Sequence, residues 1–131
     1  MSNSTLFLEV FAKITMNRVL QETNLVSAYC EGSLFLSRDH AGLFAFTAND
    51  SDGISVCLVK YTEKYINWEF VIIEGEPEEG DLVEDYYVDM ITVNKDEDGD
   101  FIVDVECANH TRGRTVLYRD GTLRKVPIFL C

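Results

Sequence analysis

Carboxylates gather in one stretch of this chain, and side chains of this type at this density can do two kinds of chemistry. Residues 74–106 contain fourteen Asp and Glu residues and a single cation, Lys95. Fourteen carboxylates against one lysine leave this stretch with a net charge of −13, whereas the whole chain of 131 residues carries −12. Clustered carboxylates can bind a hard cation such as calcium, or they can present negative charge to a basic partner.

The turn within this stretch tests the first possibility. Asn94, Asp96, Asp98 and Gly99 match the first half of an EF-hand calcium loop. The twelfth position of such a loop requires a bidentate Glu, and here it is Val105. The flanking segments also read as strands instead of helices. We therefore interpret the stretch as an Asp/Gly-rich hairpin turn, and the sequence predicts no metal site and no cofactor.

The sequence contains few residues in patterns that are typical of catalytic sites. The chain has no G-x-S-x-G, H-E-x-x-H or glycine-rich phosphate loop, and the one candidate pair is His110 as a base beside Cys107. The cysteines are scattered without a C-x-x-C pair, which does not suit zinc: Cys30, Cys57, Cys107 and Cys131. We expect reduced thiols and a protein that is not an enzyme.

Strands are the elements predicted to position the carboxylates. Asp/Gly-rich turns recur about every ten residues, which is typical of a meandering antiparallel sheet. Alternation predicts a first strand over 5–16, and Asn17 and Gly32 bracket a predicted helix over 17–30. The later strands are predicted at 33–37, 42–48, 54–61, 67–74, 83–93, 101–107, 114–119 and 123–130.

These elements predict one domain over residues 1–131. The fold class is mainly β (α+β), with a curved antiparallel sheet or a barrel-like meander and one helix near the N-terminus. We expect the helix to pack on one face of the sheet or to plug one end of it.

The hairpin formed by 83–93 and 101–107 decides where the acid would lie. Four apolar residues of the second strand are predicted to share its core face: Phe101, Val103, Val105 and Cys107. A loop over 95–98 would place Asp89 opposite Asp104. The polar face of the hairpin would then gather four carboxylates, with two turn acids at its tip and the 74–81 loop nearby: Asp85, Asp89, Asp104 and Glu106, then Asp96 and Asp98.

Like charges that face each other across strands are destabilising, so this arrangement suggests a cationic partner. Neighbouring carboxylates on one face of a strand lie ~6.6 Å apart, close to twice the ~3.4 Å between phosphates of one DNA strand. A carboxylate row could therefore stand in for alternate phosphates in a basic DNA-binding groove. The alternative is a solvated face that basic residues of the same chain neutralise: Arg112, Arg114, Arg119, Arg124 and Lys125.

Two segments resemble the uracil-DNA glycosylase inhibitors of bacteriophages, which are acidic DNA mimics: VLQETNL (19–25) and ANDSDGISVCLVKYTEKYINWEFVII (48–73). Gln21, Glu22 and Thr23 match the Gln-Glu-Ser motif of that family, with Thr in place of Ser. Its apolar pocket strand and the segment that follows are matched by Val56, Leu58, Tyr65, Trp68, Val71 and Ile72. The resemblance implies that Glu22 mimics a phosphate and that Val56 and Leu58 line a pocket for a loop of the target enzyme.

Charge and resemblance lead to one function hypothesis and one alternative. The first is a non-enzymatic acidic inhibitor, plausibly phage-encoded, that mimics DNA and blocks the basic groove of a DNA-handling host enzyme, with uracil-DNA glycosylase as the enzyme that the resemblance implies. Its partner-binding residues would be Glu22, Val56, Leu58, Asp85, Asp89, Asp96, Asp98, Asp104 and Glu106. The alternative is an intracellular β-barrel carrier of a small apolar ligand, similar in length and strand count to lipocalins and fatty-acid-binding proteins.

Location and partners are also constrained. No apolar run approaches the length of a membrane span, and Glu9 and Lys13 interrupt the N-terminal apolar stretch. A net charge of −12 repels nucleic acid. We expect a cytoplasmic protein, in the host cell if it is viral, that binds a basic protein and neither nucleic acid nor membrane.

The incomplete EF-hand match generates the first testable prediction. Because Val105 cannot close the loop with a carboxylate, we expect no calcium affinity better than about the millimolar range of weak extracellular modules. Titration calorimetry with calcium, with magnesium as the control, measures it directly. Micromolar calcium binding would show that the acidic turn is a metal site.

Overall fold

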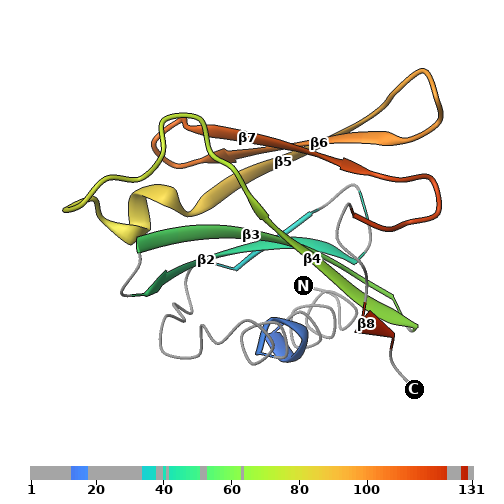
Figure 1. Cartoon of the computed structure of the whole chain (residues 1–131), viewed down its shortest axis with the longest axis horizontal. Helices are drawn as coiled ribbons and strands as arrows, with labels where there is room; N and C mark the ends of the chain where they lie inside the picture. Colours follow the sequence, from blue (N-terminus) through green and yellow to red (C-terminus); the bar gives the residue numbers. More distant parts are fainter. Residues whose placement is uncertain are drawn as a thin grey trace, which may run out of the picture.

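The computed structural model describes residues 13–17, 34–37, 40, 42–50, 53–62, 64–123 and 128–129. These residues form two antiparallel sheets, and a short helix over 13–17 lies near the N-terminus (Figure 1). The prediction of a mainly β fold with a helix near the N-terminus is confirmed. Neither of the two described sheets closes into a barrel, so the antiparallel sheet is the predicted architecture that is found, divided into two layers.

The larger sheet has five strands in the order β1-β2-β3-β4-β8. They are β1 (Phe35–Leu36), β2 (Leu43–Asp50), β3 (Gly53–Tyr61), β4 (Tyr65–Val71) and β8 (Ile128–Phe129). The pairing of β2 with β3 runs from Leu43 opposite Lys60 to Asp50 opposite Gly53. All five strands overlap ranges that alternation predicts: 33–37, 42–48, 54–61, 67–74 and 123–130.

The smaller sheet has three strands in the order β5-β6-β7 and follows a short 3-10 helix, η3. Their bounds are η3 (Val83–Tyr86), β5 (Val88–Lys95), β6 (Phe101–Cys107) and β7 (Arg112–Leu117). β6 has the predicted bounds, and β7 begins two residues before the predicted 114–119.

The main core lies between the two sheets. Val56 and Leu58 of β3 pack in the same buried cluster as Val103 and Val105 of β6. As alternation predicts, every second residue of β6 faces this cluster: Phe101, Val103, Val105 and Cys107. Burial of these apolar side chains stabilises the packing of one sheet on the other.

A second buried cluster covers the opposite face of the five-stranded sheet. Met16 of the N-terminal helix is fully buried there. Its neighbours in the cluster come from β2, β3 and β4: Phe44, Phe46, Ala48, Cys57, Val59, Ile66 and Trp68. The described helix over 13–17 therefore packs on one face of a sheet, whereas the helix predicted over 17–30, for which this position was one of two expected, lies beyond residue 17 outside the described residues.

The predicted strand over 5–16 is wrong at its end, because residues 13–17 are helical. The adjacent residues Thr15 and Met16 are both buried, which a helix allows and a strand packed on one face does not. The remainder of that strand and the predicted helix beyond residue 17 lie outside the described residues.

The predicted strand over 83–93 is wrong at its start, where the chain forms η3 before β5 begins. The helical turn buries Tyr86 and leaves its neighbours Glu84 and Asp85 exposed. Thr47 on the inner face of β2 donates a hydrogen bond of 2.8 Å to the carbonyl of Tyr86. This anchor satisfies a buried polar group and holds η3 against the core.

The two sheets are joined where the chain leaves β4. Ile73 forms an isolated antiparallel bridge with Gly113 of β7, and the N–H of Glu74 donates to the carbonyl of Arg112 at 2.8 Å. A Cβ on Gly113 would lie 2.4 Å from Val71 Cγ1 and 3.0 Å from the carbonyl oxygen of Ile72. This crossing therefore requires glycine, because any side chain would push the two backbones apart.

The crossing generates a stability prediction. Gly113→Ala should lower the free energy of unfolding by about 1–3 kcal/mol, as overpacking does in a tight core. Urea denaturation measures the change. Gly80→Ala is a comparison of a different kind: an added Cβ meets nothing within 4 Å there, so any loss of stability comes from the positive φ of Gly80 alone. Unchanged stability of Gly113→Ala would contradict the close approach.

Candidate functional site

The fourteen carboxylates of 74–106 do not form one face. The stretch that leads from β4 to β5 lies at one end of the molecule in Figure 1, and the tip of the β5–β6 hairpin lies at the other. β5 has eight residues between them, so the two ends are roughly 25 Å apart. The 74–81 loop was expected near the polar face of the hairpin, and its first residue, Glu74, borders the same groove as Asp104 and Glu106 of that face.

The hairpin register also differs from the expected one. Val93 pairs with Val103, and Asp104 pairs with Thr92. The pairing shifts between Val88 and Met90, so Asp89 occupies an irregular position with no partner residue in the ladder. The predicted pair of Asp89 with Asp104 is wrong, because a longer turn pairs Asp104 with Thr92, and the bulge leaves Asp89 without a partner residue in the ladder. Asp85 is not on the hairpin at all, since it belongs to η3.

The two carboxylates on the outer face of β6 are neutralised by arginines of β7. The guanidinium of Arg114 donates to Asp104 at 2.7 Å and 3.3 Å, a bidentate pair, and the pKa of Arg114 is raised by this contact. Arg112 lies 3.5 Å from the carboxylate of Glu106. Both pairs are cross-strand neighbours in the β6–β7 register. For Asp104 and Glu106 this is the arrangement expected of a face neutralised from within the chain.

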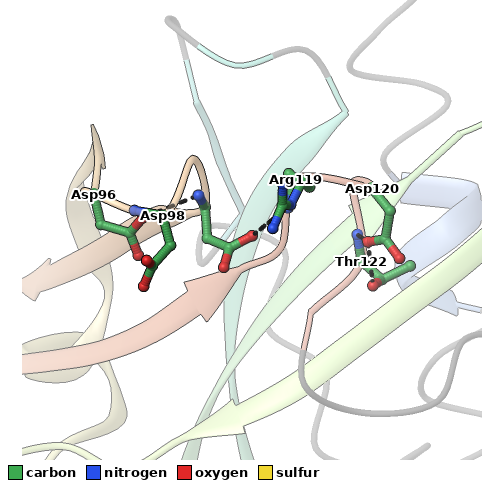
Figure 2. A network of polar contacts seen from close by, with 6 residues as sticks. Asp96, Asp98, Arg119, Asp120 and Thr122 are labelled. Carbon is green, nitrogen blue, oxygen red and sulfur yellow. Dashed lines mark hydrogen bonds and ion pairs between the residues drawn. The ribbon is translucent and has the colours of Figure 1, made fainter.

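The acids at the hairpin tip shape the turns. Figure 2 shows Asp96, whose carboxylate accepts hydrogen bonds from the N–H groups of Asp98 and Asp100 at 2.9 Å and 3.0 Å. Asp100 in turn accepts from the N–H of Arg119 at 2.8 Å. Within the described residues no group of three His, Cys, Asp or Glu side chains could hold a metal ion. The tip acids therefore stabilise two adjacent turns through hydrogen bonds to backbone groups.

A different group of carboxylates has no cation partner in the part of the chain that the structure describes. The acidic segment, residues 74–89, contains no Lys or Arg, and all its carboxylates are on exposed residues: Glu74, Glu76, Glu78, Glu79, Asp81, Glu84, Asp85 and Asp89. Asp81 accepts from the N–H of Glu78 at 2.8 Å and from the hydroxyl of Tyr86 at 2.7 Å, and these bonds lower its pKa. Among the described residues, no cation forms an ion pair with any of the eight.

The acidic segment is held in place at both ends. The bond from the N–H of Glu74 to Arg112 fixes its start. Near its end, the turn between β6 and β7 donates from Asn109 to the carbonyl of Asp85 at 3.1 Å and from Ala108 to Tyr87 at 2.9 Å. A charged surface that is fixed before binding loses little conformational entropy when a partner docks.

Exposed apolar side chains lie beside and within this segment. Four of the large exposed hydrophobic residues fall between positions 70 and 90: Phe70, Ile72, Leu82 and Met90. Ile72 and Met90 line a groove of about 710 Å³ over the outer face of the three-stranded sheet. Ile72 also borders a shallower hollow of about 260 Å³ with Phe70 and Pro77. Exposed apolar residues rimmed by charge are a common feature of protein-binding surfaces.

Alternation along the predicted strand 67–74 places Phe70 and Ile72 on one face and Val71 and Ile73 on the other. It does not tell which face another layer covers, so Ile72 could not be recognised as exposed. Alternation along the predicted strand 83–93 places Met90 on the same face as Tyr86 and Val88, and the bulge beside Met90 turns it outward instead.

The residues carried over from the resemblance lie elsewhere. Glu22 is outside the described residues. Val56 and Leu58 are buried because the three-stranded sheet covers their face of β3. Val56 is among the residues that line the hollow of about 260 Å³ beside Phe70, and Leu58 is not.

The candidate catalytic pair is not suited to nucleophilic chemistry. Cys107 is fully buried, and burial raises the pKa of its thiol, with the Asp89 and Glu106 carboxylates acting in the same direction. A thiol with a raised pKa is a poor nucleophile. His110 is exposed, and its Nδ1 lies 3.6 Å from Glu106.

Comparison with known proteins yields no match to a family model, a curated protein or a solved structure. In the part of the chain that the structure describes, no helix is long and apolar enough to cross a membrane.

The different surroundings of Asp104 and Asp89 generate a prediction. Asp104→Lys should lower the melting temperature by about 3 °C, because it replaces an ion pair by a repulsion with Arg114. Asp89→Lys, with the same change in charge, should leave the melting temperature unchanged or raise it, since Asp89 pairs with no cation among the described residues. Differential scanning calorimetry of the two variants compares them, and equal shifts would contradict the neutralised hairpin.

Proposed function

We propose that this protein is a non-enzymatic inhibitor that binds the basic groove of a DNA-handling enzyme through the end of the molecule that carries the acidic segment. The observation that supports it best is that exposed apolar residues lie beside exposed carboxylates over positions 70–90, and that these carboxylates have no cation partner among the described residues. The charge would steer a basic partner to this end, and the apolar residues would stabilise the complex once water is excluded.

The proposed DNA mimicry does not use the regular row of carboxylates along a strand that the sequence predicts. Asp104 and Glu106 are the only same-face carboxylates of β6, and both are paired with arginine. The phosphate-like charges would instead be those of the acidic segment, which a loop and η3 present. Uracil-DNA glycosylase is the candidate target that the resemblance suggests, and a phage protein acting in the host cytoplasm is the matching setting.

The alternative of an apolar-ligand carrier receives no support from the described core. Such a carrier needs an apolar cavity of several hundred Å³ inside the barrel. Here side chains of both sheets fill the space between the layers, including Leu58, Val103 and Leu117. The groove of comparable volume lies on the outside and is lined largely by charged residues.

Neutralisation at two opposite ends tests the proposal. Glu79→Gln combined with Glu84→Gln removes two charges from the acidic segment, and Glu97→Gln combined with Asp98→Asn removes two from the hairpin tip. We expect the first variant to weaken inhibition of the target enzyme about tenfold at low salt, and the second to change it far less. Inhibition assays with bacterial uracil-DNA glycosylase, and then with other purified enzymes that bind DNA, measure the effect.

Equal weakening by the two variants would mean that only net charge matters, which contradicts a defined surface. If the protein neither binds nor inhibits any enzyme of the panel, the inhibitor function is wrong.

A further inference from the structure

We propose that the groove over the outer face of the three-stranded sheet holds an aliphatic side chain of the partner, carried on an extended segment whose neighbouring residues are Lys or Arg. This inference rests on the proposed function and names the contact that follows electrostatic capture. The groove of about 710 Å³ lies directly beside the acidic segment, and Glu74 belongs to both.

The exposure of Ile72 is imposed by its neighbours. Val71 and Ile73 are buried in the core on either side of it, and the bridge from Ile73 to Gly113 fixes the strand. With both neighbours inside, alternation directs Ile72 outward, where 79% of its surface is exposed. A partner that covers this large aliphatic side chain would gain affinity from its burial.

Met90 supplies the second apolar wall. The pairing shift between Val88 and Met90 turns it to the outer face, with 49% of its surface exposed. Methionine adapts to irregular apolar shapes, which suits a binding surface. Ile72 and Met90 thus border the same groove from segments far apart in the sequence.

The paired charges on the floor of the groove favour an aliphatic group in the middle of the bound segment. Arg114 pairs with Asp104, and Arg112 pairs with Glu106, so the floor offers little net charge to a bare cation. The aliphatic stems of the two arginines can cover an apolar group while their charged heads stay paired. A cation on either side of that group would instead meet Glu74 and the unpaired acids that follow it.

The lining favours a protein segment over a small molecule. Sites for small molecules are lined mainly by apolar and aromatic side chains that enclose the ligand. The apolar side chains that face this groove are those of Ile72 and Met90, since the side chain of Val105 lies in the core between the sheets, and the other side chains of the lining are polar or charged. Nucleic acid is disfavoured by the carboxylates at the rim.

Two synthetic peptides of equal charge test the proposal, Lys-Lys-Leu-Lys-Lys and Lys-Lys-Gly-Lys-Lys, both with blocked ends. Titrations of the protein, followed by methyl NMR, give the affinity and the site of binding. We expect the leucine peptide to bind about tenfold more tightly, with the largest shifts at the Ile72 and Met90 methyl groups. This gain should disappear in Ile72→Ser combined with Met90→Ser.

Ile14→Ser is the matched control, because Ile14 is also exposed (61%) but belongs to the helix on the far face of the five-stranded sheet. It should keep the gain. Equal affinity for the two peptides, or loss of the gain in Ile14→Ser, would overturn the aliphatic contact and leave the acidic surface intact. Failure of both peptides to bind would contradict the electrostatic capture on which the proposed function depends.

Discussion

The backbone contact between Ile73 and Gly113 is the constraint on which the rest of the molecule depends. It carries the chain from the five-stranded sheet to the edge of the three-stranded sheet and so closes one side of the core. The same contact fixes which residues after β4 face inward. Ile72 is directed into solvent and Glu74 begins the acidic segment beside the groove because the residue between them is tied to β7. The contact between Ile73 and Gly113 therefore determines both the packing of the two sheets and the position of the candidate binding surface.

Most of the β-structure follows from local pattern. Alternation identifies β6 at its observed bounds and places Val103 and Val105 in the core, because one face of that strand is covered and the other is not. Prediction of strands from alternation fails where a tertiary contact outweighs the local pattern. Residues 13–17 are helical since Met16 is buried on a sheet formed by distant residues, and η3 replaces the start of a strand since Tyr86 is anchored by Thr47.

The candidate site was less predictable than the fold. The sequence showed where acid is concentrated but not which carboxylates would meet a cation. The decisive feature was the register of the three strands: the turn pairs Lys95 with Phe101 and so places Asp104 beside Thr92, and the pairing of β6 with β7 places Asp104 opposite Arg114. Periodicity predicts neither register, nor the bulge that leaves Asp89 without a partner residue. Of the nine predicted partner-binding residues, Asp85 and Asp89 belong to the unpaired acidic segment. Asp104 and Glu106 are paired with arginines, Asp96 caps a turn, and Val56 and Leu58 are in the core. Asp98 is exposed at the hairpin tip, and Glu22 lies outside the described residues.

The charge that appears as one block in the sequence therefore serves two separate purposes. At physiological salt the screening length is about 8 Å, and the hairpin tip lies roughly 25 Å from the acidic segment, so neither end contributes much to the field at the other. Acids at the tip are used for hydrogen bonds that bend the chain, as Asp96 does. Acids of 74–89 make few such bonds, and their repulsion is not relieved within the described protein. The acidic segment carries the larger set of exposed carboxylates without a cation partner among the described residues, and the exposed Ile72 beside it distinguishes a binding surface from a merely solvated one.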